Sequence, residues 1–254
     1  MQQLFLAGSA ALSATAFPFL CTCIGALLGC NARSSSPDSV ANRATLGFAG
    51  GVMLAASVFS LLLPAVELAQ QQGYPGWLAA CGGFALGAAF LVLLDFYLQQ
   101  AKPGYSLSSF AITLHNLPEG MAVGLSAALA ALSGTGLLAG VGALAFGVGV
   151  QNLPEGTAVA LPVLHSTKSR AKALRAGVLS GIVEPVGGLL AALLAGIAAI
   201  VLPWLLAFSA GAMVYVTAQE LIPTACSNTV KGFAGTLGVL AGFVLMMALD
   251  LSLG

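Results

Sequence analysis

Long apolar segments separated by short polar breaks constrain the fold of this chain more than any other feature. A helix needs about twenty predominantly apolar residues to cross the hydrocarbon core of a bilayer. Eight segments reach approximately that length, and they cover residues 4–30, 44–69, 77–98, 107–131, 137–165, 173–200, 204–225 and 232–252. The breaks are too short to link separate domains, so residues 1–254 are predicted to form a single transmembrane domain. The predicted fold class is an all-α polytopic membrane protein.

The composition agrees with a surface that faces lipid. Only 6% of the residues are charged and 59% are hydrophobic, whereas about a quarter of a soluble domain is charged. The 32 glycines fit as well, because membrane helices use small residues to let their backbones approach closely. The net charge is zero and no basic tract is present, so we expect the lipid bilayer as a partner and no nucleic acid.

The basic residues indicate how the chain is oriented. All 8 of them lie on or beside the loops that follow predicted spans 1, 3, 5 and 7, namely Arg33, Arg43, Lys102, Lys168, Arg170, Lys172, Arg175 and Lys231. The loops on the opposite face carry none. Because cytoplasmic loops collect lysine and arginine, both termini are predicted to be extracytoplasmic.

The acidic residues lie where a charge is costly. Of the 8 acidic residues, only Asp38 lies in a predicted loop. A charged side chain inside a membrane costs about 2.5–3.5 kcal/mol on insertion scales and usually marks an ion or substrate pathway. No membrane-embedded lysine or arginine can neutralise the deep residues Glu119, Glu155 and Glu184. These carboxyl groups are therefore either protonated or paired with a bound cation.

An internal repeat carries two of the deep acids. The sequence His-Asn-Leu-Pro-Glu-Gly at 115–120 recurs as Gln-Asn-Leu-Pro-Glu-Gly at 151–156. One short loop near Gly134 separates the two predicted helices, so they run antiparallel with their motifs at similar depth. Glu184 lies at a similar depth in the sixth span, counted from the preceding loop. Three helices are therefore expected to bring ligand atoms to one level of the membrane.

Helix geometry suggests how the first motif works. At 100° per residue, His115 lies about 40° to one side of Glu119 and Asn116 about 60° to the other. The two oxygens of the carboxylate could therefore each bind one metal ion. The second motif repeats the arrangement, with Glu155 between Gln151 and Asn152.

Prolines follow the polar residues in three spans. Pro118, Pro154 and Pro185 would free backbone carbonyls four residues earlier, and kinked or broken helices are tolerated where they line a binding site. Kinks are therefore predicted in spans 4 and 5. Kinked helices with amides that pair across the bundle would also explain the prolines, but they would leave the glutamates without partners.

These motifs resemble the ZIP (Zrt-/Irt-like) family of metal transporters, and its GufA-like bacterial branch in particular. The matching features are the two copies of x-Asn-x-Pro-Glu-Gly and the Gly-Ile-Val-Glu-Pro-Val-Gly-Gly segment at 181–188. Two copies on consecutive membrane helices are highly specific. The resemblance implies transport of divalent metal ions into the cytoplasm across the bacterial inner membrane. Zinc is favoured, with cadmium, iron(II) and manganese as alternatives.

The resemblance also implies a binuclear site. One metal ion would be held by Met53, His115, Glu119, Gln151 and Glu155, and the second by Asn116, Glu119, Asn152, Glu155 and Glu184. Around this site, Glu67 and Asp250 would flank the outer entrance, while Asp95, Gln219 and Glu220 would line the inner exit. The metal would move by an elevator-type sliding of spans 1, 4, 5 and 6 against the others.

Two departures and two alternatives accompany this resemblance. Many family members have histidine where Gln151 stands, and many have a histidine-rich loop between spans 3 and 4, which this chain lacks. A membrane metallohydrolase usually needs two or three histidines at its metal, and here the only 2 histidines lie fifty residues apart. We therefore expect neither enzymatic activity nor a cofactor, the metal being substrate. A metal-selective channel and a homodimer stay open.

Overall fold

The structure is a computed structural model that describes residues 2–31, 39–101, 108–133, 138–227 and 233–253. Within these ranges every secondary-structure element is a helix, as the sequence predicts. The elements are α1 (Gln2–Asn31), α2 (Val40–Ala56), η1 (Ser57–Leu62), α3 (Leu63–Gln71), α4 (Gly76–Ala101), α5 (Ser108–Ser133), α6 (Leu138–Thr167), α7 (Arg170–Gly181), α8 (Val183–Leu193), α9 (Ala195–Val216), η2 (Thr217–Leu221), α10 (Ile222–Cys226) and α11 (Ala234–Leu253).

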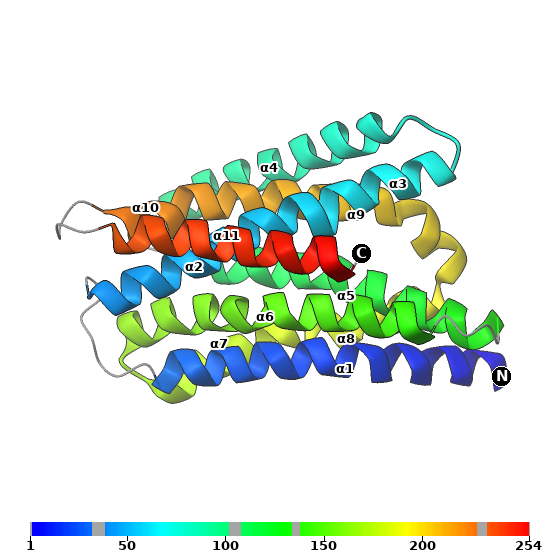
Figure 1. The fold of residues 1–254 in the computed structure, drawn as a ribbon, viewed down its shortest axis with the longest axis horizontal. Helices are drawn as coiled ribbons and strands as arrows, with labels where there is room; N and C mark the ends of the chain where they lie inside the picture. The colour runs from blue at the N-terminus through cyan, green and yellow to red at the C-terminus, as the bar shows by residue number, and fades with distance from the viewer. Residues whose placement is uncertain (1, 32–38, 102–107, 134–137, 228–232, 254) are drawn as a thin grey trace.

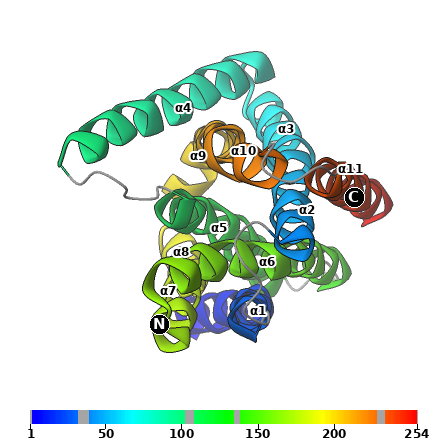
Figure 2. The same ribbon diagram turned by 90° about the vertical axis from the view of Figure 1, so that its left-hand side faces the viewer.

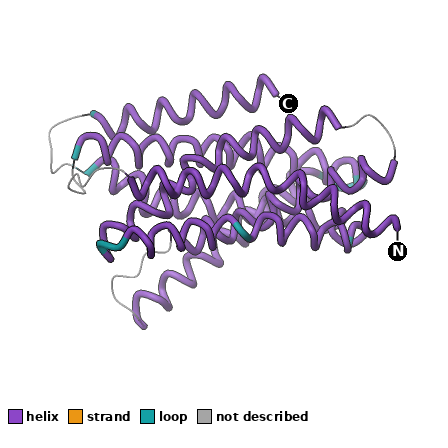
Figure 3. Tube along the Cα trace, turned by 90° about the horizontal axis from the view of Figure 1, so that it is seen from below, coloured by secondary structure: helices purple, strands orange, loops and turns teal. Residues whose placement is uncertain are grey.

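Among the described residues, six helical stretches are long and apolar enough to cross a membrane. They are Gln2–Asn31, Val40–Gln71, Gly76–Tyr97, Arg170–Leu193, Ala195–Cys226 and Ala234–Ser252. Helices α5 and α6, with 26 and 30 residues, are also long, but they carry the repeated polar motif. The helices run side by side along the long axis of the molecule (Figures 1 and 3).

The helices pack as two groups, which Figure 2 shows from one end of the molecule. Helices α1, α5, α6, α7 and α8 form the first group, called the motif bundle here because it carries both copies of the repeat. The remaining helices form the second bundle. The most extensive packing joins α1 to α6 and α5 to α8 in the motif bundle, and α2 to α11 and α4 to α9 in the second bundle.

Glycines bring backbones together inside each bundle. A Cβ atom on Gly156 of α6 would lie 2.1 Å from the carbonyl oxygen of Thr22 in α1. In the second bundle, a Cβ atom on Gly51 of α2 would lie 2.0 Å from the carbonyl oxygen of Val239 in α11. Every described glycine whose Cβ would approach another atom within 3.0 Å makes that contact inside its own bundle. Close backbone contact therefore holds each bundle together, as expected for membrane helices.

Two π-helical turns interrupt long helices of the second bundle, η1 between α2 and α3 and η2 between α9 and α10. The turn η1 is followed by Pro64, and the turn η2 is followed by Pro223 at the corresponding place. Proline lacks the N–H group that an α-helix needs at an interior position, and a local π-helical turn often accompanies a functional site. The sequence predicts uniform helices here, so these turns are findings of the structure. They place Ser60 and Glu220 on π-helical backbone.

The predicted break between spans 6 and 7 is wrong in position. The sequence places it at Pro203, whereas α8 ends at Leu193 and α9 begins at Ala195. Pro203 lies inside α9, because neighbouring helices can satisfy the backbone group that a proline frees in a membrane. The expected effect of Pro185 is present, since the helix is interrupted at Ile182. Helices α5 and α6 continue past their motif prolines.

Candidate metal centre

The motif residues form a buried polar cluster inside the motif bundle. Helix α5 supplies three of them, α6 another three and α8 one. All of them are between 0% and 2% exposed, namely His115, Asn116, Glu119, Gln151, Asn152, Glu155 and Glu184. Glu184 lies in the first turn of α8, where the unpaired backbone N–H groups favour a negative charge. Three carboxylates are thus buried together, which is costly unless cations accompany them.

The imidazole of His115 lies between the two repeated glutamates. Its Nε2 atom is 3.1 Å from Oε1 of Glu119 and 3.3 Å from Oε1 of Glu155. Neither contact has hydrogen-bond geometry. One ligand atom from each of these three residues lies within 4.8 Å of the other two. Gln151 joins the group, since its Nε2 atom donates a hydrogen bond to Oε1 of Glu119. These four side chains are four of the five that the resemblance assigns to the first metal position, the fifth being Met53.

The two motif asparagines are turned so that their nitrogens bind backbone carbonyls. Nδ2 of Asn116 donates to the carbonyl oxygen of Ser180 at 3.1 Å, and Nδ2 of Asn152 donates to that of Pro18 at 3.4 Å. The oxygen of each amide is left without a hydrogen-bond partner. Both asparagines therefore offer a carbonyl oxygen, which suits a divalent cation.

Every residue of the second predicted position carries an oxygen without a hydrogen-bond partner. Buried oxygens without a hydrogen-bond partner occur on all five residues that the resemblance assigns there, namely Asn116, Glu119, Asn152, Glu155 and Glu184. Glu184 also interacts electrostatically with both Glu119 and Glu155, so the three carboxylates are close. A buried polar atom without a partner costs about 1–3 kcal/mol. A metal ion bound by these oxygens would offset that cost, so the residues present fit a metal ion.

Met53 is placed differently from the other predicted ligands. It is 1% exposed and belongs to the largest apolar cluster of the molecule, together with residues such as Leu46, Val159 and Met213. This environment is that of a packed core side chain, and a thioether is a common filler of such cores. Its role as a metal ligand stays a prediction.

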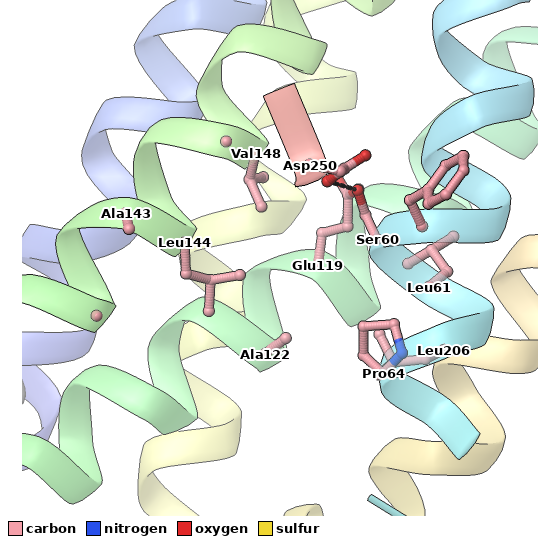
Figure 4. Close-up of a pocket in the computed structure, with 13 residues that line it drawn as sticks. Ser60, Leu61, Pro64, Glu119, Ala122, Ala143, Leu144, Val148, Leu206 and Asp250 are labelled. Atoms are coloured by element: carbon pink, nitrogen blue, oxygen red, sulfur yellow. Dashed lines mark hydrogen bonds between the residues drawn. The ribbon is translucent and has the colours of Figure 1, made fainter. Parts of the chain in front are cut away.

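Two adjacent cavities lead from one end of the molecule to Glu119. A cavity of about 390 Å³ is lined by Glu119, Ser60 and Asp250 (Figure 4). A second cavity of about 460 Å³ shares Ser60 with it and reaches Glu67 and the end of α3. That end of α3 lies on the same side as the N-terminus (Figure 1). Glu67 and Asp250 thus line adjacent cavities, and the one lined by Asp250 also includes Glu119.

Ser60 links these cavities to the predicted metal ligands. Its hydroxyl donates to Oδ1 of Asp250 at 2.8 Å and lies 3.3 Å from Oε1 of Gln151, also as a donor. Since Gln151 donates in turn to Glu119, a chain of polar contacts runs from α11 through η1 to α6 and α5. The sequence does not single out Ser60.

The residues predicted at the inner exit gather in the second bundle. Tyr215 donates a hydrogen bond of 2.8 Å to Oδ2 of Asp95, and Glu220 interacts electrostatically with the same tyrosine. Gln219 is exposed. The two cavities described above include none of these residues. Tyr215 is a further residue that the sequence does not single out.

The supporting hydroxyls lack a sequence signal. A serine or threonine in an apolar helix often bonds the carbonyl of its own preceding turn, so its presence says little about a site. Thr22 and Ser60 both face carboxylates of other helices, and those contacts depend on how the helices pack. These contacts can therefore be identified only from a three-dimensional structure.

Comparison with known proteins shows which family the chain belongs to. Residues 98–250, which include all the motif residues, match the family described as ZIP Zinc transporter. The chain is 41% identical over 213 residues to the zinc transporter GufA of Myxococcus xanthus, covering 77% of this chain and 81% of that protein. It is 36% identical over 252 residues to the zinc transporter ZIPB of Bordetella bronchiseptica, covering 93% of this chain and 79% of that protein. It is 34% identical over 301 aligned positions to the human zinc transporter ZIP11, covering 83% of this chain and 88% of that protein. The chain therefore belongs to the ZIP zinc transporter family.

Proposed function

We propose that this chain carries divalent transition metal ions, zinc above all, through a two-metal site inside the bacterial cytoplasmic membrane and into the cytoplasm. The observation that carries this proposal is the set of buried, unpaired oxygens around Glu119 and Glu155. The relatives named above are zinc transporters by name. The metal ion is the transported substrate, and the chain needs no cofactor for this function.

The two positions share the repeated glutamates. Glu119 and Glu155 each have one oxygen beside His115, at 3.1 and 3.3 Å. Each also has a second oxygen, Oε2, without a hydrogen-bond partner. The first position combines an imidazole with carboxylates, which suits zinc and cadmium, whereas the second offers only oxygens. Two ions side by side, bridged by both carboxylates, satisfy every one of these atoms.

Uptake into proteoliposomes tests the proposal directly. Vesicles containing the purified chain should accumulate zinc with saturation kinetics, and cadmium, iron(II) and manganese should compete with it. Protein-free vesicles are the control, and the voltage and pH are clamped. Ion-selective current without saturation would favour the channel alternative, and absence of metal flux would contradict the proposal.

Eight transmembrane spans with extracytoplasmic termini follow if α5 and α6 also cross the membrane. Their polar motif residues are buried, and neighbouring helices of both bundles cover them. The described basic residues Lys168, Arg170, Lys172 and Arg175 lie around the start of α7, at the end of the molecule opposite the N-terminus (Figure 1). That end would face the cytoplasm.

Cysteine labelling tests this orientation. In a background without native cysteines, Gln71→Cys at the end of α3 should react with an impermeant thiol reagent added outside, and Ser166→Cys at the end of α6 should not. Both positions are exposed in the structure. Gly73 is a poorer choice because its φ of 85° strains any other residue, and Gly134 and Ser35 lie outside the described residues. The reverse labelling pattern would overturn the proposed topology.

An elevator-type movement agrees with how the helices pack. The close glycine contacts lie within each bundle, so each bundle can behave as one body. No described glycine makes such a close contact between the two bundles. The motif bundle contains α1, α5, α6 and the pair α7 and α8, which correspond to the predicted spans 1, 4, 5 and 6. If the motif bundle moved as one body, the metal site would be exposed alternately to the two sides of the membrane.

The role of His115 predicts a change in selectivity. His115→Ala removes the only imidazole of the first position, so the affinity for zinc should fall by at least the roughly 10–100-fold typical of losing a group that merely orients a ligand. Affinity for manganese should fall less, because manganese prefers oxygen ligands. Competition between the two metals in the uptake assay measures the ratio. An unchanged zinc-to-manganese ratio would show that His115 is not a ligand.

A further inference from the structure

A threonine of α1 holds the acid that is unique to the second metal position. The hydroxyl of Thr22 donates a hydrogen bond of 2.9 Å to Oε1 of Glu184, and both side chains are fully buried. Helix α1 contributes no residue to the predicted ligand set. The contact nevertheless leaves Glu184 with one partnered oxygen, Oε1, and one unpartnered oxygen, Oε2.

The same turn of α1 also orients a second ligand. The carbonyl oxygen of Pro18 accepts from the Thr22 hydroxyl at 3.2 Å and from Nδ2 of Asn152 at 3.4 Å. The amide nitrogen of Asn152 is thereby engaged, and its oxygen is left for a metal ion. One turn of α1 therefore fixes two side chains of the second position, one on α6 and one on α8.

The backbone around Thr22 is closely packed on two sides. A Cβ atom on Gly156 would lie 2.1 Å from the carbonyl oxygen of Thr22, and one on Gly181 would lie 3.0 Å from its Cβ atom. These glycines let α6 and α7 press directly against α1. The hydroxyl of Thr22 is therefore held at a fixed distance from α8, as a group that orients a ligand requires.

We infer that Thr22 is a positioning residue that makes Glu184 a one-oxygen ligand of the second metal position. The inference rests on the proposed two-metal function. A hydrogen bond to Oε1 fixes the rotation of the carboxylate and directs a single oxygen to the ion. Without it, the carboxylate is free to rotate away or to bind through both oxygens, and the geometry of the site is lost. Groups that hold a metal ligand in this way typically contribute 10–100-fold to metal affinity.

The experiment compares three variants by calorimetric titration of zinc into purified protein. Thr22→Val keeps the shape of the side chain and removes the hydroxyl, so it should lower the affinity of the second position by roughly 10–100-fold and leave the first unchanged. Thr22→Ser keeps the hydroxyl and should retain both affinities. Thr15→Val is the matched control, because Thr15 lies two turns earlier in α1, is equally buried, and bonds only backbone carbonyls of its own helix.

A second arm separates positioning from packing. In a Glu184→Gln background the carboxylate is already absent, so Thr22→Val should cause little further loss, since coupled residues are not additive. Full additivity, failure of Thr22→Ser to retain affinity, or an equal loss in Thr15→Val would each overturn the positioning role. If wild type binds two ions and Thr22→Val binds both normally, the inference is wrong while the proposed function stands. If wild type never binds a second ion, the two-metal function itself fails.

Discussion

Glu119→Gln and Glu155→Gln should each reduce zinc uptake to the level of protein-free vesicles. In the proposed site each glutamate is shared by both metal positions, so its replacement weakens the binding of two ions at once. Oε1 of Glu119 lies 3.1 Å from the imidazole of His115, while its Oε2 atom has no hydrogen-bond partner. Glutamine has nearly the same shape, but it loses the negative charge and replaces one oxygen by a nitrogen that cannot bind a cation.

Replacing a bridging glutamate should lower the metal affinity more than replacing a group that only orients a ligand. Removing a residue that only orients a ligand costs about 10–100-fold, and a carboxylate that touches both ions contributes more. The buried site should still fold, because an amide in place of a buried carboxylate removes a desolvated charge. Membrane abundance and the size-exclusion profile of each variant provide the control. Near-normal uptake by either variant, at normal abundance, would remove the bridging role.

The predicted ligands were accessible from the sequence because their positions follow from short-range rules. The repeat fixes the residues of each motif on one helix, and a single loop between the two helices fixes their relative depth. Charge in an apolar segment then marks the functional face. For this reason His115, Glu119 and Glu155 are found together in the structure, as predicted.

The remaining features depend on packing between helices that are far apart in the sequence. The contact of Thr22 with Glu184 joins α1 to α8, and that of Ser60 with Asp250 joins η1 to α11. No spacing rule connects such pairs. The misplaced boundary at Pro203 has a different cause, since a proline favours a break in the sequence pattern, whereas α9 contains this one in its interior. The sequence does not predict the π-helical turns, because their hydrophobic pattern does not differ from that of an α-helix.

Glu184→Gln should lower the number of bound metal ions from two towards one. In the proposed site Glu184 is the only acid that belongs to the second position alone, and one of its oxygens accepts the hydrogen bond from Thr22. The variant leaves that position with two amide oxygens and a share of the bridging carboxylates. Because sites built from oxygen ligands depend on carboxylate charge, the second ion should be lost first.

The first position should survive this change. It keeps the imidazole of His115 and both bridging glutamates, which lie 3.1 and 3.3 Å from Nε2. Crystals of wild type and of Glu184→Gln soaked in cadmium would show two anomalous peaks and one, respectively, and the peak beside His115 should remain. Calorimetry with zinc gives the same comparison in solution. If the substitution empties both positions, or if wild type never holds more than one ion, the carboxylates form a single site and the assignment of two separate positions is wrong.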